Sequence, residues 1–267
     1  MEKLTLNNKV KIPIIGLGVY QSNPGMETEN AVLEALRLGY RHIDTAAIYR
    51  NEESVGNAIK KSKIPREEIF ITTKLANQDH SDTLKAFNES LKKLQLDYID
   101  LYLIHWPAEQ RLNSWKILEK IYESGNAKSI GVSNFTIKHL KQLLEIAKVI
   151  PVINQVEFSP YLYQKELLDF CNENKIQLEA YSPLTRGHKL NDKKLIDIAN
   201  NYNKTPAQIL LRWSIQHNIV VIPKSTKKER IKENFDVFNF SIKKEDMKKL
   251  DDFNENFRTC WDPSNIP

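Results

Sequence analysis

The chain has 267 residues, of which 41% are hydrophobic and 27% are charged, and its formal net charge is +5. This balance is typical of a globular protein, and the length suits one large α/β domain of roughly 250 residues. The positive charge is spread along the chain and does not gather in one basic stripe, which argues against a nucleic-acid-binding protein.

The two cysteines, Cys171 and Cys260, lie far apart and form no CxxC pair. This spacing indicates neither a disulfide framework nor a zinc ribbon, and it fits a reducing compartment. The N-terminal sequence lacks the apolar core of a signal peptide, and no apolar run approaches the about 18 residues of a membrane span. We therefore expect a soluble, cytoplasmic protein that binds neither membranes nor nucleic acids.

The first predicted element is a β-hairpin. Residues 4–12 alternate apolar and polar side chains around Asn7-Asn8, and asparagine tolerates the positive φ of a tight turn. Eight short apolar runs follow, and we predict a strand at each: 14–18, 42–46, 69–75, 99–105, 129–133, 153–157, 177–182 and 219–223.

Amphipathic helical patterns separate these runs. Apolar residues recur every three or four positions, for example, in 27–39, 82–94 and 137–149. Gly39 and Gly125 stand where glycines follow helix ends, and Thr205-Pro206 is a typical helix start. Residues 243–257 predict a last amphipathic helix, followed by a non-helical tail.

Alternating strands and helices without a linker predict a single domain over residues 1–267. We expect a (β/α)₈ TIM barrel with an N-terminal β-hairpin and extra C-terminal helices. An open doubly wound sheet is the alternative. That fold usually carries GxGxxG after its first strand, and Gly16-Leu17-Gly18 is not followed by the third glycine.

Polar side chains stand at the carboxyl ends of the predicted strands, where such a barrel has its active site. Asp44 ends the second strand, and Tyr49 follows in the next loop. Lys74 ends the third strand and His105 the fourth. This set suits carbonyl reduction, because a tyrosine can donate the proton and an ammonium lowers its pKa from about 10. Each residue alone is easily explained by packing or a buried salt bridge, but four at successive strand ends favour catalysis.

The segment after the eighth strand predicts a phosphate site. Its polar residues are Lys224, Ser225, Arg230, Glu233 and Asn234. Phosphate sites of barrels commonly follow strands seven and eight at a helix N-terminus, where free N–H groups favour an anion. The alternative is a solvated basic segment, since Lys227 and Lys228 adjoin it. The position in the barrel and the spacing of the polar residues favour binding.

In chain order these segments resemble the aldo-keto reductase family over essentially the whole chain. The matching blocks are residues 39–46 with Tyr49, 71–75, 103–107, 131–135, 154–157, 180–184 and 222–225 with Arg230, Glu233 and Asn234. Any one block is moderately specific, and the ordered set is very specific.

The resemblance implies NADPH-dependent reduction of small aldehydes or ketones, without a metal, by a protein that is usually monomeric. Tyr49 would be the general acid, tuned by Lys74 and Asp44, and His105 would orient the substrate. The implied cofactor contacts are Asp44, Ser133, Asn134, Gln155, Tyr181, Ser182, Leu184, Lys224, Ser225, Arg230, Glu233 and Asn234. Of these, Ser133, Asn134 and Gln155 would hold the nicotinamide carboxamide, and Tyr181 would stack on its ring.

The substrate pocket is where the sequence departs from the family pattern. Tyr20, His105 and Trp106 are its expected walls, but Ala76 stands where many relatives have tryptophan, and the loop 108–113 is short. These departures predict an open, permissive pocket. Two other functions remain open at this point: a non-redox barrel that uses Lys74 as a Schiff-base amine, and an NADPH-binding sensor or regulatory subunit with slow turnover.

Overall fold

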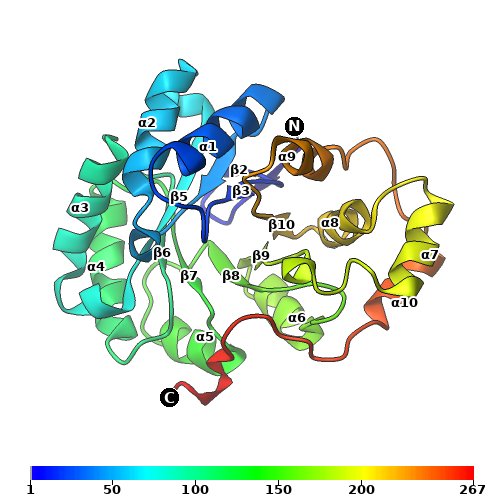
Figure 1. The fold of residues 1–267 in the computed structure, drawn as a ribbon. Coiled ribbons are helices and arrows are strands. Elements are labelled where there is room, and N and C mark those ends of the chain that lie inside the picture. The colour runs from blue at the N-terminus through cyan, green and yellow to red at the C-terminus, as the bar shows by residue number, and fades with distance from the viewer. Residues whose placement is uncertain (1) are drawn as a thin grey trace.

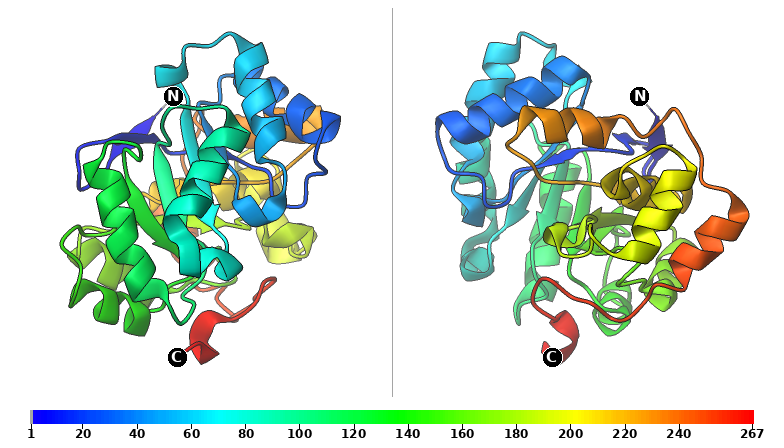
Figure 2. Two further views of the ribbon diagram at one scale, coloured as in Figure 1. Left: turned by 90° about the vertical axis from the view of Figure 1, so that its left-hand side faces the viewer. Right: turned by 45° about the vertical axis from the view of Figure 1, so that its right-hand side comes forward.

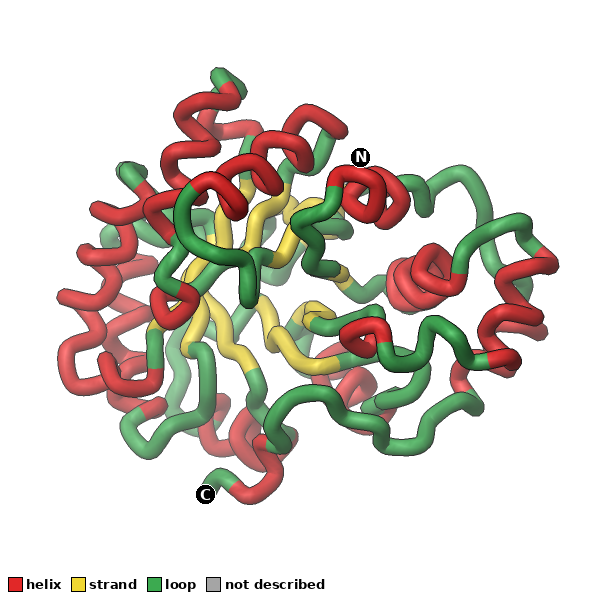
Figure 3. Tube along the Cα trace, viewed as in Figure 1, coloured by secondary structure: helices red, strands yellow, loops and turns green. Residues whose placement is uncertain are grey.

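Eight parallel strands form the centre of the structure, a computed structural model that describes residues 2–267 (Figures 1 and 3). Each strand pairs with the next along the chain, so the order is β3 through β10. The strands are β3 (Leu17–Gly18), β4 (His42–Asp44), β5 (Phe70–Leu75), β6 (Leu101–Ile104), β7 (Ile130–Ser133), β8 (Ile153–Glu157), β9 (Gln177–Tyr181) and β10 (Val220–Val221). All eight lie within the predicted runs.

The sheet closes on itself between its first and last strands. Ile15 bridges Val221, and Gly18 bridges Lys224, both in parallel orientation. The Gly16 amide donates to the Val221 carbonyl at 2.9 Å. A Cβ at Gly18 would lie 2.9 Å from the Ile222 carbonyl oxygen, so this close approach requires glycine. The predicted closed barrel is confirmed, and the open sheet is excluded.

Helices surround the strands, as Figure 3 shows in red. They are α1 (Met26–Leu38), α2 (Glu52–Ser62), α3 (Thr83–Leu94), α4 (Arg111–Glu123), α5 (Ile137–Leu144), α6 (Lys165–Glu173), α7 (Lys193–Asn201), α8 (Pro206–Gln216), α9 (Lys228–Phe235) and α10 (Lys244–Asp251). Gly39 ends α1 with a φ of 105°, and Thr205 caps α8 by accepting from the Gln208 amide. The predicted helix boundaries at these two places are confirmed.

Two predicted helices are shorter than their sequence patterns indicate. The helix predicted over 137–149 ends at Leu144, because the Glu119 carboxylate accepts hydrogen bonds from the Lys148 and Val149 amides at 2.7 and 2.9 Å. The helix predicted over 243–257 ends at Asp251. Beyond it the amides of Glu255 and Phe257 donate to the Tyr161 carbonyl, which draws the chain along the barrel.

The N-terminal hairpin and the C-terminal tail lie apart in both views of Figure 2. In the predicted hairpin, β1 (Lys3–Thr5) pairs antiparallel with β2 (Lys11–Pro13). Leu6 and Ile12 pack against apolar side chains near the amino ends of the strands, such as Phe70 and Val152. The tail crosses the opposite end and finishes in a 3₁₀ turn (Pro263–Asn265) beside α5 (Figure 1). No helix within residues 2–267 is long and apolar enough to span a membrane.

Candidate active site

Four side chains from three adjacent strands meet at the carboxyl end of the barrel. Asp44 is the last residue of β4, and Tyr49 closes the one-turn 3₁₀ helix after it (Ala47–Tyr49). Lys74 lies near the end of β5, and His105 directly follows β6. Parallel pairing of β4, β5 and β6 places these strand ends side by side. The structure therefore brings together the four residues that the sequence singled out.

A buried ion pair forms the floor of this site. Lys74 Nζ donates to Asp44 Oδ1 at 2.6 Å and to the Thr45 carbonyl at 2.8 Å, and both side chains of the pair are almost fully buried. Burial raises the pKa of Asp44, and the Lys74 ammonium opposes that rise. An amine held in this way is charged and enclosed, whereas a Schiff-base nucleophile must be neutral and reachable. The geometry therefore disfavours the non-redox alternative.

Tyr49 and His105 stand above the ion pair. The Tyr49 hydroxyl lies 3.5 Å from His105 Nε2, and Lys74 Nζ lies 5.1 Å from the centre of the tyrosine ring. Burial, followed by the Lys74 charge, holds the pKa of His105 well below 6.5, so the imidazole is neutral near pH 7. A neutral imidazole beside a phenol can donate a hydrogen bond to the same carbonyl oxygen that the phenol contacts.

The expectation that Lys74 lowers the pKa of Tyr49 is wrong for this structure. Burial raises the pKa of Tyr49 well above 10, and the Asp44 charge raises it further. Asp44 is paired with Lys74 at 2.6 Å, so the ammonium does not bring the pKa of Tyr49 below its ordinary value in the resting site. Tyr49 therefore keeps its proton through the neutral range, which is the form that a proton donor needs.

A chain of hydrogen bonds continues from His105 around the mouth. Asn134, which has a φ of 64°, donates from Nδ2 to the His105 carbonyl at 2.9 Å and accepts from the Tyr181 hydroxyl at 2.8 Å. Ser133 Oγ donates to the Gln155 carbonyl at 2.8 Å. Gln155 Nε2 donates to Asp44 Oδ2 at 2.8 Å. These residues form one connected rim with the acid-base group.

Exposed cations gather between β10 and the first turn of α9, namely, Lys224, Lys227, Lys228 and Arg230. Lys224 and Arg230 are solvent-exposed, and neither forms an ion pair with another described residue. The buried Ser225 accepts from the Lys227 amide at 3.1 Å, just before α9 begins. Such a free pair of cations beside a helix N-terminus suits an anion.

Two other residues of the same predicted set lie deeper. The Glu233 carboxylate already accepts from Thr205 Oγ1 at 2.6 Å, and Asn234 is buried in α9. Glu233 thus supports the start of α8 as well as standing near the exposed cations. Further round the mouth, Ser182 Oγ lies 3.8 Å from Cys260 Sγ, and Leu184 is partly buried against the core.

Aromatic side chains wall the mouth. Tyr20 packs on Tyr49 with ring centres 5.0 Å apart, and Trp106 faces Trp261 of the tail at 6.1 Å. Trp261 is 80% exposed, so this wall is open to solvent. The predicted walls Tyr20, His105 and Trp106 therefore lie around Tyr49, with Trp261 added by the tail.

Glu157 holds that tail in place, a role the sequence did not reveal. Its carboxylate accepts from Thr259 N at 2.7 Å, from Thr259 Oγ1 at 2.5 Å and from Cys260 N at 3.1 Å. Arg186 adds a bond to the Thr259 carbonyl and another to Gln21 Oε1 at 2.7 Å. An acidic residue at the carboxyl end of a predicted strand was the available sequence clue.

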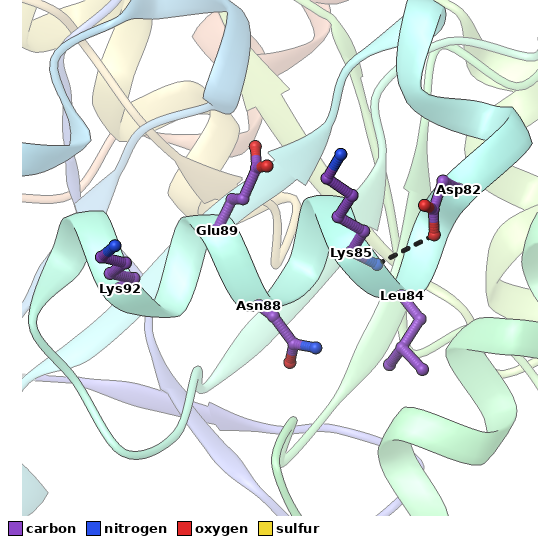
Figure 4. A pocket seen from close by; sticks show the side chains of 6 residues that line it. All are labelled: Asp82, Leu84, Lys85, Asn88, Glu89 and Lys92. Atoms are coloured by element: carbon purple, nitrogen blue, oxygen red, sulfur yellow. Dashed lines mark hydrogen bonds between the residues drawn. The ribbon is translucent and has the colours of Figure 1, made fainter.

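A second missed residue, Glu179, lies inside the barrel and accepts from Gln155 Nε2 at 3.0 Å. Its clue was a carboxyl group in the middle of an apolar strand. By contrast, the hollow of about 390 Å³ drawn in Figure 4 lies on the outside of α3. It is lined by Asp82, Leu84, Lys85, Asn88, Glu89 and Lys92. No strand-end residue lines it, so the chemistry belongs at the mouth.

Comparison with known proteins agrees with this geometry. The sequence model of the aldo/keto reductase family matches residues 14–255. The chain belongs to the aldo-keto reductase family. It is 49% identical over 268 residues to the glyoxal reductase of Bacillus subtilis (strain 168), covering 99% of this chain and 97% of that protein.

Solved structures of aldo-keto reductases share the fold. MGS-M4, an aldo-keto reductase from a Medee basin deep-sea metagenome library, superposes with a TM-score of 0.95 at 49% identity, covering 99% of each chain. The Bombyx mori aldo-keto reductase in complex with NADP gives 0.90 at 39% identity, covering 96% of this chain and 94% of that one. This chain is accordingly an oxidoreductase of a carbonyl-reducing family with the TIM-barrel fold.

Proposed function

We propose that this aldo-keto reductase reduces small aldehydes and ketones to alcohols with NADPH, and that Tyr49 donates the proton. The observation that carries the proposal is the Tyr49 hydroxyl 3.5 Å from a neutral His105, above the buried Lys74–Asp44 pair. A substrate oxygen placed over the two side chains could accept a hydrogen bond from both. The relatives named as glyoxal reductase and as an NADP complex support the substrate class and cofactor.

The protein groups divide the work. When bound, the reduced nicotinamide supplies the hydride that reaches the carbonyl carbon. Tyr49 gives its proton to the carbonyl oxygen, and His105 fixes that oxygen in place. Lys74 Nζ lies 5.1 Å from the tyrosine ring, so its charge would then offset part of the negative charge left on Tyr49.

The residues fit a phosphorylated dinucleotide. The exposed Lys224 and Arg230 offer positive charge without an internal partner, as a 2′-phosphate would require. At the other end Ser133, Asn134 and Gln155 offer hydrogen-bonding side chains next to Asp44. The proposed preference is therefore for NADPH over NADH.

The test follows absorbance at the reduced-nicotinamide band, with purified protein and methylglyoxal or a nitrobenzaldehyde. We expect loss of absorbance that needs both protein and aldehyde and is faster with NADPH than with NADH. Confirmed NADPH binding without turnover would instead favour the sensor function. Neither binding nor turnover would overturn the cofactor assignment.

The Tyr49→Phe variant isolates the proton donor. It should bind NADPH as tightly as the wild type and lose about 10²- to 10⁴-fold in reduction rate, the usual contribution of a positioned acid. Unchanged turnover would refute the role of Tyr49. Size-exclusion chromatography at working concentration tests the accompanying proposal that the enzyme is a monomer.

A further inference from the structure

A cluster of polar side chains extends from the active site into the barrel interior. Gln155 Nε2 donates to Asp44 Oδ2 at 2.8 Å and to Glu179 Oε2 at 3.0 Å, so one amide joins two carboxyl groups. Gln155 and Glu179 face each other in the register of β8 and β9. Glu179 is fully buried, and its Oε1 has no hydrogen-bond partner among the described residues.

The positive charge in this cluster is insufficient for two ionised carboxylates. Lys74 lies 2.6 Å from Asp44, whereas the group facing Glu179 Oε1 is His42 Nε2 at 3.7 Å. Burial and then Lys74 lower the pKa of His42 to about 3, so it is neutral. From the neighbouring strand Thr72 contacts His42 at 3.0 Å without charge, and Val220 pairs with Glu179 on the other side.

Of the two carboxyl groups, Glu179 is the one that holds a proton. Two buried carboxylates that share one amide repel each other, and Asp44 alone has an ammonium to stabilise its charge. Burial and the Asp44 charge raise the pKa of Glu179 to about 8, from an ordinary value of 4.5. With Glu179 protonated, the cluster of Lys74, Asp44 and Glu179 has no net charge, which avoids the cost of an unpaired charge in the barrel interior.

This arrangement determines what Gln155 can offer a ligand. An ionised Asp44 only accepts, so the Gln155 amide nitrogen must face it. Both amide protons are then used, one on Asp44 and one on Glu179. No described side chain donates to the Gln155 oxygen, which remains as an acceptor for a primary amide such as the nicotinamide carboxamide.

We propose that Glu179 is a positioning residue of this enzyme: its protonated carboxyl group fixes the Gln155 amide and keeps the charge of the Lys74–Asp44 pair balanced. The cofactor part of this inference rests on the proposed function. The protonation part concerns the protein alone. The two parts are tested by separate measurements.

The first measurement uses the cofactor-free protein. Urea unfolding of wild type and Glu179→Gln is followed at several pH values from 5 to 9. The unfolded chain releases the Glu179 proton near pH 4.5, but the folded protein keeps it to about 8. Wild-type stability relative to Glu179→Gln should therefore fall as pH rises from 5 to about 8, and then level off. A stability difference independent of pH would overturn the proposal.

The second measurement compares Glu179→Gln with Glu179→Met. Glutamine can still accept from Gln155, so it should bind NADPH as the wild type does at pH 7, whereas methionine cannot and should weaken binding about 3- to 10-fold. Nucleotide binding is read from protein fluorescence. Equal affinity of all three proteins would overturn the positioning role. Failure of the wild type to bind would refute the proposed function instead, and the urea series would still decide the protonation state.

Glu52 provides the matched control. It is also a buried carboxyl group with one hydrogen-bonded oxygen, which accepts from Thr73 Oγ1 at 2.6 Å, and one oxygen without a partner. Among the described residues it forms no hydrogen bond with Gln155 or Asp44. Glu52→Gln should leave NADPH affinity unchanged. If it weakens binding as much as Glu179→Met does, general damage to the core explains the loss and the proposal fails.

Discussion

The two ends of the barrel mouth differ in whether their charged side chains are buried and paired. At the acid-base end Lys74 and Asp44 are buried and bound to each other and to their surroundings at 2.6–2.8 Å. At the α9 end Lys224 and Arg230 are exposed and have no ionic partner among the described residues. The charges at the first end have their partners within the protein, whereas the cations at the second end would find a partner only in an anionic ligand.

This difference separates folding from binding. Groups that are desolvated and paired during folding keep their geometry when substrate arrives, so they suit proton transfer. Exposed cations stay hydrated in the free protein and contribute little to its stability. They gain most of their electrostatic interaction energy when an anionic ligand binds. Substitutions at the first end should therefore affect both stability and rate, and those at the second end should affect affinity alone.

The largest effect is expected for Lys74→Met, which removes the cation of the buried pair. It leaves the Asp44 carboxylate uncompensated, which should cost about 3–5 kcal/mol of unfolding free energy. Reduction should fall by at least the about 10²- to 10⁴-fold expected for loss of the proton donor, since the Tyr49 phenolate loses its counter-charge. Urea unfolding and steady-state rates measure the two effects.

The double variant Lys74→Met with Asp44→Asn is the control. It removes both charges, so it should recover much of the stability without recovering the activity. If the single variant is as stable as the wild type, the charges of Lys74 and Asp44 do not depend on each other in the folded protein.

Arg230→Ala should show the opposite pattern, with an effect on cofactor affinity and none on stability. We expect unchanged stability, unchanged kcat and a KM for NADPH raised about 10- to 100-fold, as for loss of a hydrogen bond to a charged group. The KM for NADH should change little, because NADH lacks the 2′-phosphate. Lys232→Ala, in the same helix, is the matched control. Equal losses for NADPH and NADH would show that Arg230 does not contact the phosphate.

Sequence patterns predicted the repeating part of the molecule well. Short apolar runs and amphipathic spacing are local properties, so the eight strands and the helix start at Thr205 follow from them. The strand-end positions of Asp44, Lys74 and His105 follow for the same reason, since parallel strands bring their carboxyl ends together.

The parts that could not be predicted depend on contacts between distant segments. Helix α5 ends early because Glu119, on another helix, binds the following amides. The raised pKa of Tyr49 depends first on its burial and then on the nearby Asp44 charge, and residue spacing reveals neither. The tail has no periodic pattern, and its path over the mouth is set by the Glu157 carboxylate.

Glu157→Gln tests this control of the tail and should have a moderate effect. The tail amides and the Thr259 hydroxyl make three hydrogen bonds to two carboxylate oxygens, and an amide keeps only one of these acceptors. Trypsin should then cut after Arg258 several-fold faster, and the KM for aldehyde should rise while kcat stays within about twofold. Glu255→Gln is the control, because Glu255 lies in the same tail and forms an ion pair with Lys189 instead of binding the tail amides. Equal cleavage of all three proteins would contradict the role of Glu157.

The smallest effect is expected for Trp261→Ala, at the open edge of the pocket. Because this side chain is 80% exposed, its loss should change the unfolding free energy by no more than about 0.5 kcal/mol. It faces Trp106 at 6.1 Å, so a large aromatic aldehyde can contact both rings, whereas a small dicarbonyl bound near Tyr49 need not. The KM for nitrobenzaldehyde should rise a few-fold and that for methylglyoxal should stay unchanged, with Trp261→Phe close to wild type. Equal losses for the two substrates would place Trp261 at the reacting end of the pocket. The tail would then belong with the buried acid-base end of the mouth and not with its open edge.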